Sequence, residues 1–161
     1  MAGLDLAPDG LGGESFGAEA EGVISYVVSI LGPPTEDSGW YDFVGGACGA
    51  SEGRYVSWRD LQLEFLDASP ATTGLRHFSG YRYGSAAGPV IDPFGPSIDG
   101  EVTVGDTVDE LLAIYPSTEI FADEETNSTV FQIVDGLGGS LTGSSGSDTI
   151  KSFLGGFRCG A

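Results

Sequence analysis

The stretch FGAEAEGVISYVVSILGPP, residues 16–34, decides how the rest of the chain is interpreted, because a shorter version of it, VGDTVDELLAIYP, recurs at residues 104–116. Both copies run from an apolar residue and a glycine, through acidic residues, to apolar pairs and a proline. When Gly17 and Gly105 are aligned, the apolar residues of each copy recur with the spacing of one helix face. Each copy therefore predicts an amphipathic helix that packs on another element.

Residues at the ends of both copies favour helix boundaries. Gly17 and Gly105 suit turns that need positive φ, and Asp106 is the expected cap of the second helix. Pro33 and Pro116 end the helices, because proline lacks a donor and clashes with the preceding turn. We interpret the two copies as a duplication. The alternative is that they are two unrelated amphipathic helices.

Alternation of apolar and polar residues predicts antiparallel strands after each helix. The candidates are residues 54–58, 61–65 and 75–83 in the first half and residues 119–122, 129–134, 140–143 and 149–154 in the second. Arg59-Asp60 is the expected hairpin corner, and residues 1–14 are an expected partly ordered lead-in.

This order of elements predicts an α+β fold. Two tandem repeats, each a helix followed by antiparallel strands, form one curved sheet with both helices on one face. The first repeat spans residues 1–84 and the second spans residues 101–161. Residues 85–100, which are rich in Gly and Pro, form the linker between them.

The charge of the chain excludes one class of partner. Its 161 residues include 24 acidic and six basic side chains, for a formal net charge of −18. Nucleic acid would be repelled, because phosphate binding needs a cationic surface. No apolar run is long enough to span a membrane. The first residues lack the basic and apolar regions of a signal peptide, so an exported form implies a leader that has been removed.

Cys48 and Cys159 are the only cysteines, and they form no Cys-x-x-Cys redox or zinc pattern. A disulfide between them ties the C-terminal strand to the first half of the chain and implies an oxidising compartment. The alternative is two free buried thiols. We expect the disulfide, and with it a secreted or cell-envelope protein.

The layout of a helix, a Gly-Pro stop and a meander of strands, occurring twice, resembles the β-lactamase-inhibitor-protein fold. In that family two such units form one long curved sheet whose concave face grips a partner protein. Residues 16–34 also resemble the opening of small exported lipoproteins of the outer-membrane assembly type. The residues around Trp40, Cys48 and Cys159 are similar to a group of uncharacterised secreted proteins of actinobacteria. The inhibitor family has a disulfide within each repeat, whereas this chain has two cysteines in all, so no inhibitory residue is carried over.

The strand predicted at residues 75–83 carries the candidate binding residues. A two-residue period places His77, Tyr81 and Tyr83 on one face of it and residues 76, 78 and 82 on the other. Trp58 and Tyr55 lie on a neighbouring strand, on its opposite faces. A face of Tyr, Trp and His is typical of protein contact surfaces. The alternative is that these aromatic rings fill the core beneath the helices.

No motif for catalysis, metal binding or a cofactor stands out. His77 is the only histidine, and no Gly-x-Ser-x-Gly elbow, phosphate loop or dinucleotide fingerprint occurs. The Gly- and Ser-rich residues 138–150 lack the tandem copies of calcium-binding repeats. We therefore expect no cofactor and a non-catalytic protein-binding module, with inhibition of a secreted enzyme as one outcome. The alternatives are a small carboxylate-dependent hydrolase assisted by His77, and a structural, self-assembling envelope component.

Overall fold

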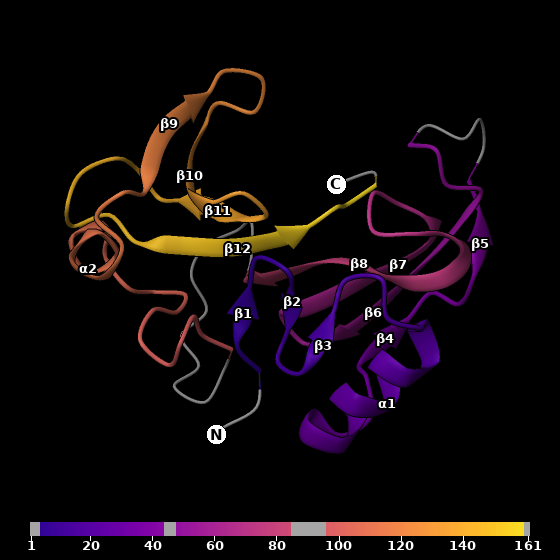
Figure 1. Cartoon of the computed structure of the whole chain (residues 1–161). Coiled ribbons are helices and arrows are strands. Elements are labelled where there is room, and N and C mark those ends of the chain that lie inside the picture. Colours follow the sequence, from indigo (N-terminus) through magenta and orange to yellow (C-terminus); the bar gives the residue numbers. More distant parts are fainter. Residues whose placement is uncertain (1–3, 44–47, 85–95, 160–161) are drawn as a thin grey trace.

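A computed structural model describes residues 4–43, 48–84 and 96–159 of the chain (Figure 1). Within these residues the fold consists of a nine-stranded antiparallel sheet, a three-stranded antiparallel sheet and two helices. The elements in chain order are β1 (Leu6–Ala7), β2 (Gly10–Leu11), β3 (Glu14–Ser15), α1 (Ala20–Leu31), β4 (Glu36–Asp37), β5 (Tyr41–Asp42), β6 (Glu52–Trp58), β7 (Leu61–Ala68), β8 (Thr73–Gly84), α2 (Val108–Ile114), β9 (Glu119–Asp123), β10 (Ser128–Val134), β11 (Leu137–Leu141) and β12 (Ile150–Gly156).

The nine-stranded sheet joins two meanders through the last strand of the chain. Its order is β4-β6-β7-β8-β12-β11-β10-β9, and β5 also pairs with β6. The first meander is β6-β7-β8, with Arg59-Asp60 at the expected corner, and the second is β9 to β12. Because β12 pairs antiparallel with β8, opposing Phe153 to Tyr83 and Gly155 to Tyr81, one sheet runs through both halves.

The segments that lead into the two helices are held alike. Gly17 N donates to Phe78 O at 2.8 Å, and Gly105 N donates to Ile150 O at 2.9 Å. Each of these glycines has positive φ, 99° and 95° respectively, a conformation that glycine adopts without strain. Two residues after each glycine, the backbone forms an isolated antiparallel bridge: Glu19 pairs with His77, and Thr107 pairs with Thr149. Both copies of the recurring stretch therefore have the same local arrangement: the residues before the helix bond to the backbone of a strand, and the helix begins directly after them.

The caps of the helices differ in part from the expectation. Glu19 caps α1 by accepting a hydrogen bond from the Glu21 amide. Thr107, and not Asp106, caps α2: its hydroxyl accepts from Glu110 N at 3.1 Å, and the Glu110 carboxylate reaches back to Thr107 N. This arrangement is a capping box, and its cap lies one residue later than the predicted cap. Asp106 instead accepts from Thr103 N at 2.9 Å.

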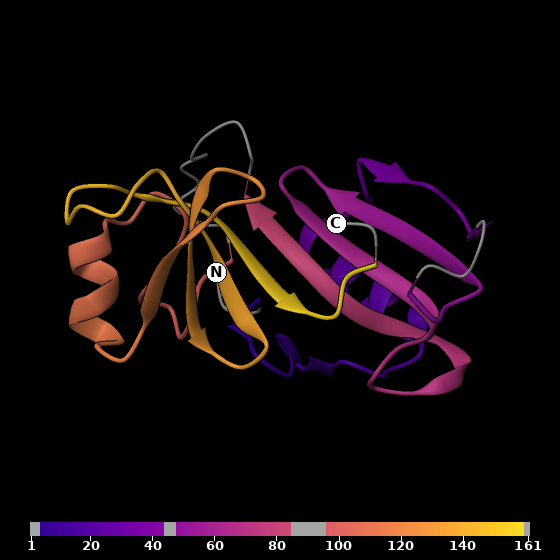
Figure 2. The same ribbon diagram turned by 90° about the horizontal axis from the view of Figure 1, so that it is seen from above.

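The predicted architecture of two tandem helix-then-strand repeats with both helices on one face is wrong. The described residues are mostly antiparallel β. The helix α1 lies across one face of β6, β7 and β8, whereas α2 stands at the far end of the molecule beside the second meander (Figures 1 and 2). The first half also contains the extra sheet β1-β2-β3, which has no counterpart in the second. The recurrence of the helix lead-in does not extend to the strands, whose number and pairing differ.

Residues 4–15, expected as a partly ordered lead-in, form that small sheet and close one side of the core. Leu6 and Leu11 are 2 % and 1 % exposed, and Leu6 N donates to Ser97 O at 2.8 Å. The sheet lies next to α1, beneath the junction of β8 and β12 (Figure 1). Its strands have two residues each, too short for alternation to reveal them.

The main core lies between the nine-stranded sheet and α1 and continues into the second half. It contains Val23 and Val27 of α1, Leu63 and Phe65 of β7, and Phe153 of β12. A second, smaller cluster of Ala50, Leu66 and Cys159 lies apart from it. The expected boundary at residue 84 and the linker at residues 85–100 lie largely outside the described residues, so the division into 1–84, 85–100 and 101–161 stays a prediction.

A β-bulge in β8 changes which of its side chains share a face. Phe65 lies opposite Phe78, but Glu64 lies opposite Gly80, so Ser79 is an extra residue in β8. Such a bulge reverses the alternation on its far side. Phe78 and Tyr81 therefore both enter the main core and are fully buried. The prediction that His77 shares a face with Tyr81 and Tyr83 is wrong for this reason.

Candidate functional site

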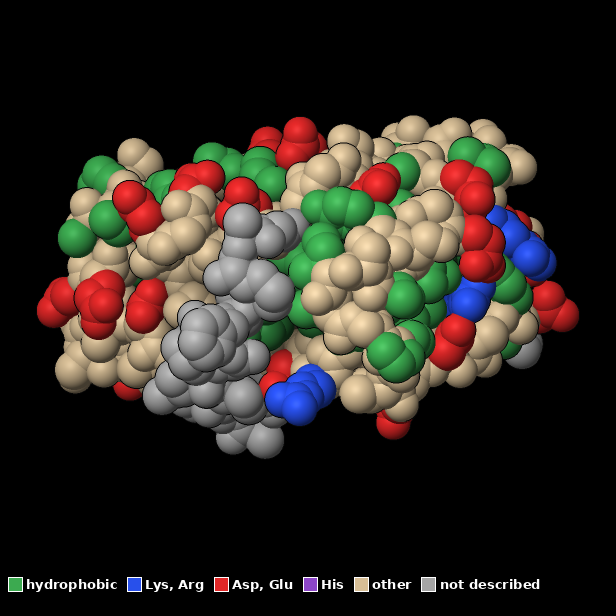
Figure 3. All heavy atoms as spheres, turned by 90° about the horizontal axis from the view of Figure 1, so that it is seen from below, with side chains coloured by type: hydrophobic (Ala, Val, Ile, Leu, Met, Phe, Trp, Pro, Cys, Tyr) green, Lys and Arg blue, Asp and Glu red, His purple; other side chains and the backbone are tan. Residues whose placement is uncertain are grey.

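An open groove of about 560 Å³ lies at the N-terminal end of α1. Residues of α1, of the segment before β5, and of β6, β7 and β8 line it: Glu19, Ala20, Glu21, Trp40, Glu52, Asp67, Gly74, Leu75 and Arg76. Figure 3 shows Lys and Arg side chains flanked by Asp and Glu at this end of the molecule. The groove combines an aromatic ring with charged groups.

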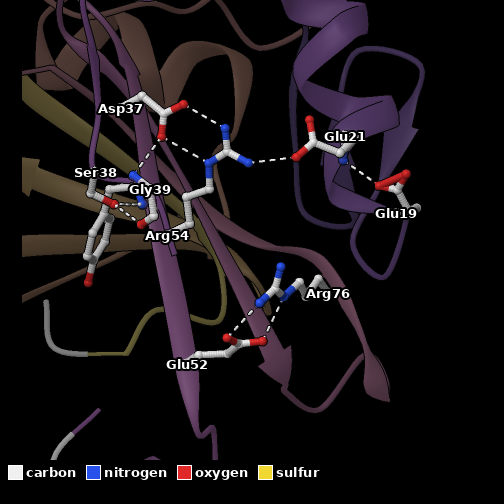
Figure 4. A network of polar contacts seen from close by, with 9 residues as sticks. Glu19, Glu21, Asp37, Ser38, Gly39, Glu52, Arg54 and Arg76 are labelled. Atoms are coloured by element: carbon white, nitrogen blue, oxygen red, sulfur yellow. Dashed lines mark hydrogen bonds and ion pairs between the residues drawn. The ribbon is translucent and has the colours of Figure 1, made fainter. Parts of the chain in front are cut away.

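Next to the groove, Arg54 of β6 ties α1 to β4 by bonding the lining residue Glu21 and Asp37. Its Nε and Nη2 donate to the two oxygens of Asp37 at 2.9 and 2.6 Å, and its Nη1 donates to Glu21 Oε1 at 2.7 Å (Figure 4). The Arg54 guanidinium holds the pKa of Asp37 below its ordinary value, and the Gly39 amide acts in the same direction against burial. Two carboxylates therefore share this one guanidinium.

Within the lining, Arg76 of β8 forms a second fork. Its Nε and Nη2 donate to the two oxygens of Glu52 at 2.7 and 2.8 Å (Figure 4). The Cζ atom of Arg76 also lies 4.3 Å from the centre of the Trp40 ring, within the range of a cation–π contact. The Arg76 side chain is still 51 % exposed. The groove thus already holds one guanidinium between an aromatic ring and a carboxylate.

The floor of the groove is fixed by Asp67 at the end of β7. Its Oδ1 accepts from the amides of Ser51 and Glu52 at 2.8 and 3.2 Å. Burial raises the pKa of this carboxyl, but those amides and the Ser51 hydroxyl outweigh it, so the pKa lies below its ordinary value. Glu52 is thereby positioned to face Arg76. The groove lining carries four carboxylates against one guanidinium, so it favours a positively charged ligand.

Four of the five predicted binding residues are buried. His77 and Tyr81 have no exposed surface, and Tyr83 and Trp58 are 5 % and 6 % exposed. Tyr81 donates to Ala7 O at 2.9 Å, and Trp58 Nε1 donates to Gly32 O at 2.9 Å. Tyr81, Tyr83 and Trp58 belong to the main core. These three side chains therefore follow the alternative given above, in which the aromatic rings fill the core.

His77 lies below the groove and is hydrogen-bonded at both ring nitrogens. Nδ1 lies 2.6 Å from Leu75 O, which only accepts, so Nδ1 is the donor there. In the neutral imidazole with its proton on Nδ1, Nε2 accepts from the Ser69 hydroxyl, 2.6 Å away. The imidazole joins the ends of β7 and β8 and presents no atom to a substrate in this conformation.

Tyr55, the fifth predicted residue, is partly buried and lies outside the main core. Its hydroxyl donates to Cys159 O at 2.8 Å, and the Cys159 amide donates to Glu64 Oε1. Cys159 is bonded to Cys48, as predicted, with their Cα atoms 5.8 Å apart. These contacts clamp the C-terminal segment onto β6 and β7, so Tyr55 has a structural role.

The sequence reasoning missed the residues of the groove. Arg54 and Arg76 were visible as two of only six basic residues, which is a signal that each has a specific acidic partner. Their partners, however, lie 17 to 33 positions away in the chain. No local spacing links them.

The groove gathers acidic side chains around one aromatic ring. Across the three described ranges, no group of His, Cys, Asp and Glu is placed to hold a metal ion. Neither helix there is long and apolar enough to cross a membrane. Comparison with protein-family models, with curated proteins and with solved structures gave no match, so the resemblance to the β-lactamase-inhibitor-protein fold and to secreted proteins of actinobacteria stays a prediction.

Proposed function

We propose that the protein is a non-catalytic binding module of the secreted or cell-envelope class, and that its groove receives a cationic side chain of a partner protein. The observation that carries this proposal is the environment of Arg76. Its guanidinium lies over the Trp40 ring and donates to both carboxylate oxygens of Glu52. This intramolecular contact supports the proposal, because a cationic side chain of a partner can make the same kinds of interaction with the aromatic ring and the carboxylates of the groove.

The charge of the whole chain supports the same ligand. With 24 acidic residues against six basic ones, the surface attracts cationic partners over a distance and raises their association rate at low salt. Two of the six basic side chains, Arg54 and Arg76, are already paired with carboxylates. The disulfide supports an oxidising compartment. Inhibition of a secreted enzyme is one form that such binding can take.

Titration with a hexa-arginine peptide, followed by calorimetry at low and moderate salt, tests the proposal. Trp40→Ala removes the stacking surface and should weaken binding by about fivefold to tenfold. Glu21→Gln removes one charge at the groove and should weaken it further than Glu125→Gln, which removes the same charge from the distant β9–β10 turn. Equal affinities for all these variants would show diffuse attraction to the acidic surface and would overturn the proposal.

The alternative of a hydrolase assisted by His77 has no observation in its favour, because the imidazole is buried and hydrogen-bonded at both nitrogens. A self-assembling envelope component is distinguished by the size of the protein in solution. A monomer over a wide concentration range is expected for the binding module.

A further inference from the structure

The uncovered face of the nine-stranded sheet carries a row of polar side chains at the junction of the two meanders. The register places Gln62 opposite Arg82, and Arg82 opposite Leu154. Directly opposed residues on neighbouring strands project from the same face. Figure 2 looks onto this face, with α1 behind β6, β7 and β8. The groove at α1 belongs to the other side of the sheet, so this row is a separate surface.

Arg158 joins the row from the segment that follows β12. A Cβ atom on Gly80 would lie 2.9 Å from Arg158 Cγ, so the arginine crosses the sheet over that glycine. Its Nη2 donates to Gln62 Oε1 at 2.9 Å. Gln62 is therefore the register partner of Arg82 and the hydrogen-bond partner of Arg158.

Unpartnered polar atoms converge on this cluster. In the described part of the chain, three buried side-chain nitrogen or oxygen atoms have no hydrogen-bond partner: Glu64 Oε2, Arg82 Nε and Arg158 Nε. Glu64 lies opposite Gly80, directly beneath the crossing Arg158. Buried polar groups are nearly always satisfied, so several orphans at one place indicate a missing polar ligand or ordered water.

The charges of the cluster identify the ligand as an anion. Arg82 and Arg158 bring two positive charges, and Glu64 brings one negative charge whose Oε1 is already occupied by the Cys159 amide. Arg82 forms no ion pair with the described residues. Burial lowers the pKa of the Arg158 guanidinium, the negative charge of Glu64 acts against it, and the positive charge of Arg82 lowers the pKa further. One positive charge is therefore left without a counter-ion.

Two features limit the size and type of that anion. The chain carries a net charge of −18, which repels an acidic protein surface but costs little for a single charge. Leu154, 38 % exposed, lies between Arg82 and Gly138 in the row, and the glycine adds no side chain above it. An apolar group can therefore lie over Leu154 while a carboxylate faces the guanidiniums.

We propose that Arg82 and Arg158 form a site for the carboxylate of a small monocarboxylic acid whose apolar tail lies on Leu154. Guanidinium forks match the two oxygens of a carboxylate. The tail replaces water on an exposed leucine, and each buried methylene adds to affinity. This site is independent of the groove at α1 and of the cationic partner proposed for it.

The test follows the arginine Nε–H signals of the isotope-labelled full chain by NMR while chloride is exchanged for acetate or butyrate at constant ionic strength. The Arg82 and Arg158 signals should shift and saturate, while the Arg59 signal in the β6–β7 corner stays in place. Butyrate should half-saturate the shift at about a fourfold lower concentration than acetate. Leu154→Ser, at an exposed position, should remove that preference and leave acetate binding unchanged.

Matched variants separate this site from general attraction of anions. Arg82→Gln should weaken butyrate binding about tenfold, and Arg82→Lys, which keeps the charge but not the fork, should weaken it as well. Lys151→Gln removes the same charge from the bulge near the start of β12, away from Arg158, and should change the affinity less than twofold. Absence of a saturable shift, equal loss in Arg82→Gln and Lys151→Gln, or equal half-saturation by inorganic phosphate would each overturn the proposal.

Discussion

Glu64 is a carboxylate with 1 % exposed surface near the centre of a sheet face. Burial raises its pKa, and this effect outweighs the Tyr55 hydroxyl, the Cys159 amide and the charge of Arg158, which all lower it. Glu64 anchors the C-terminal segment, because its Oε1 accepts a hydrogen bond from the backbone amide of Cys159, which forms the disulfide. The hydrogen bond that anchors the C-terminal segment stabilises the fold, and it offsets part of the free energy that burial of the Glu64 charge costs.

Replacing Glu64 with glutamine should therefore stabilise the protein at neutral pH, on the order of 1 kcal/mol, because glutamine keeps an acceptor for Cys159 and removes the buried charge. A carboxyl whose pKa is raised on folding binds its proton more tightly in the native state, so acidification from neutral pH towards 4.5 favours the wild type. The advantage of Glu64→Gln should accordingly shrink as the pH falls over that window. Urea unfolding of both proteins across a pH series measures it, and an advantage that grows on acidification would contradict the argument.

The element on which both meanders depend is β12. It pairs with β8 on one side and β11 on the other, so the two halves meet along its length. Gly155 makes this pairing possible, because the ring of Tyr81 packs where a Cβ atom would stand. Tyr81 in turn crosses to the small sheet and donates to Ala7 O. A single glycine thus lets β8, β12 and β1 approach one another.

Gly155→Ala should destabilise the protein by about 2 kcal/mol or more, because the added methyl overlaps the Tyr81 ring and the packed core resists the shift. Gly22→Ala is the matched control: it lies exposed within α1 with open space around it, and it should stabilise by about 1 kcal/mol through helix propensity. Thermal and urea unfolding of the two variants give the comparison. Equal effects of the two alanines would refute the role assigned to Gly155.

At the scale of the whole molecule, the disulfide closes a loop of 111 positions between Cys48 and Cys159. It fixes the C-terminal segment beside Leu66 and Ala50 in the smaller cluster. The main core, by contrast, contains residues of both halves and does not depend on this bond. The disulfide therefore stabilises the fold mainly by lowering the entropy of the unfolded chain, and the main core packs without it.

The double variant Cys48→Ser/Cys159→Ser should lose about 4 kcal/mol of unfolding free energy, because opening a loop of this length releases chain entropy in the unfolded state. One cooperative transition is still expected, since the core is continuous through both halves. Calorimetry with and without reductant measures both quantities. Reductant should lower the melting temperature of the wild type and leave that of the double variant unchanged; two separate transitions would contradict the single core.

Local patterns were sufficient to predict most secondary structure. The apolar period and the Gly-Pro stop located α1, and alternation located β6, β7 and β8 with the corner at Arg59-Asp60. Strands of two residues escaped because alternation needs a longer run. In the candidate site, the composition showed that basic residues are rare. It did not reveal the acidic partners of Arg54 and Arg76, because those partners lie on other elements.

The sequence by itself determined where the helices and the longer strands form, the acidic surface and the two cysteines available for a bond, because propensity, periodicity and charge depend on neighbours in the chain. The tertiary structure alone decided that β12 lies beside β8, that a bulge at Ser79 turns the aromatic rings inward, and that Arg76 meets Trp40. Those features depend on contacts between distant segments, where a shift of one residue in register exchanges the two faces of a strand.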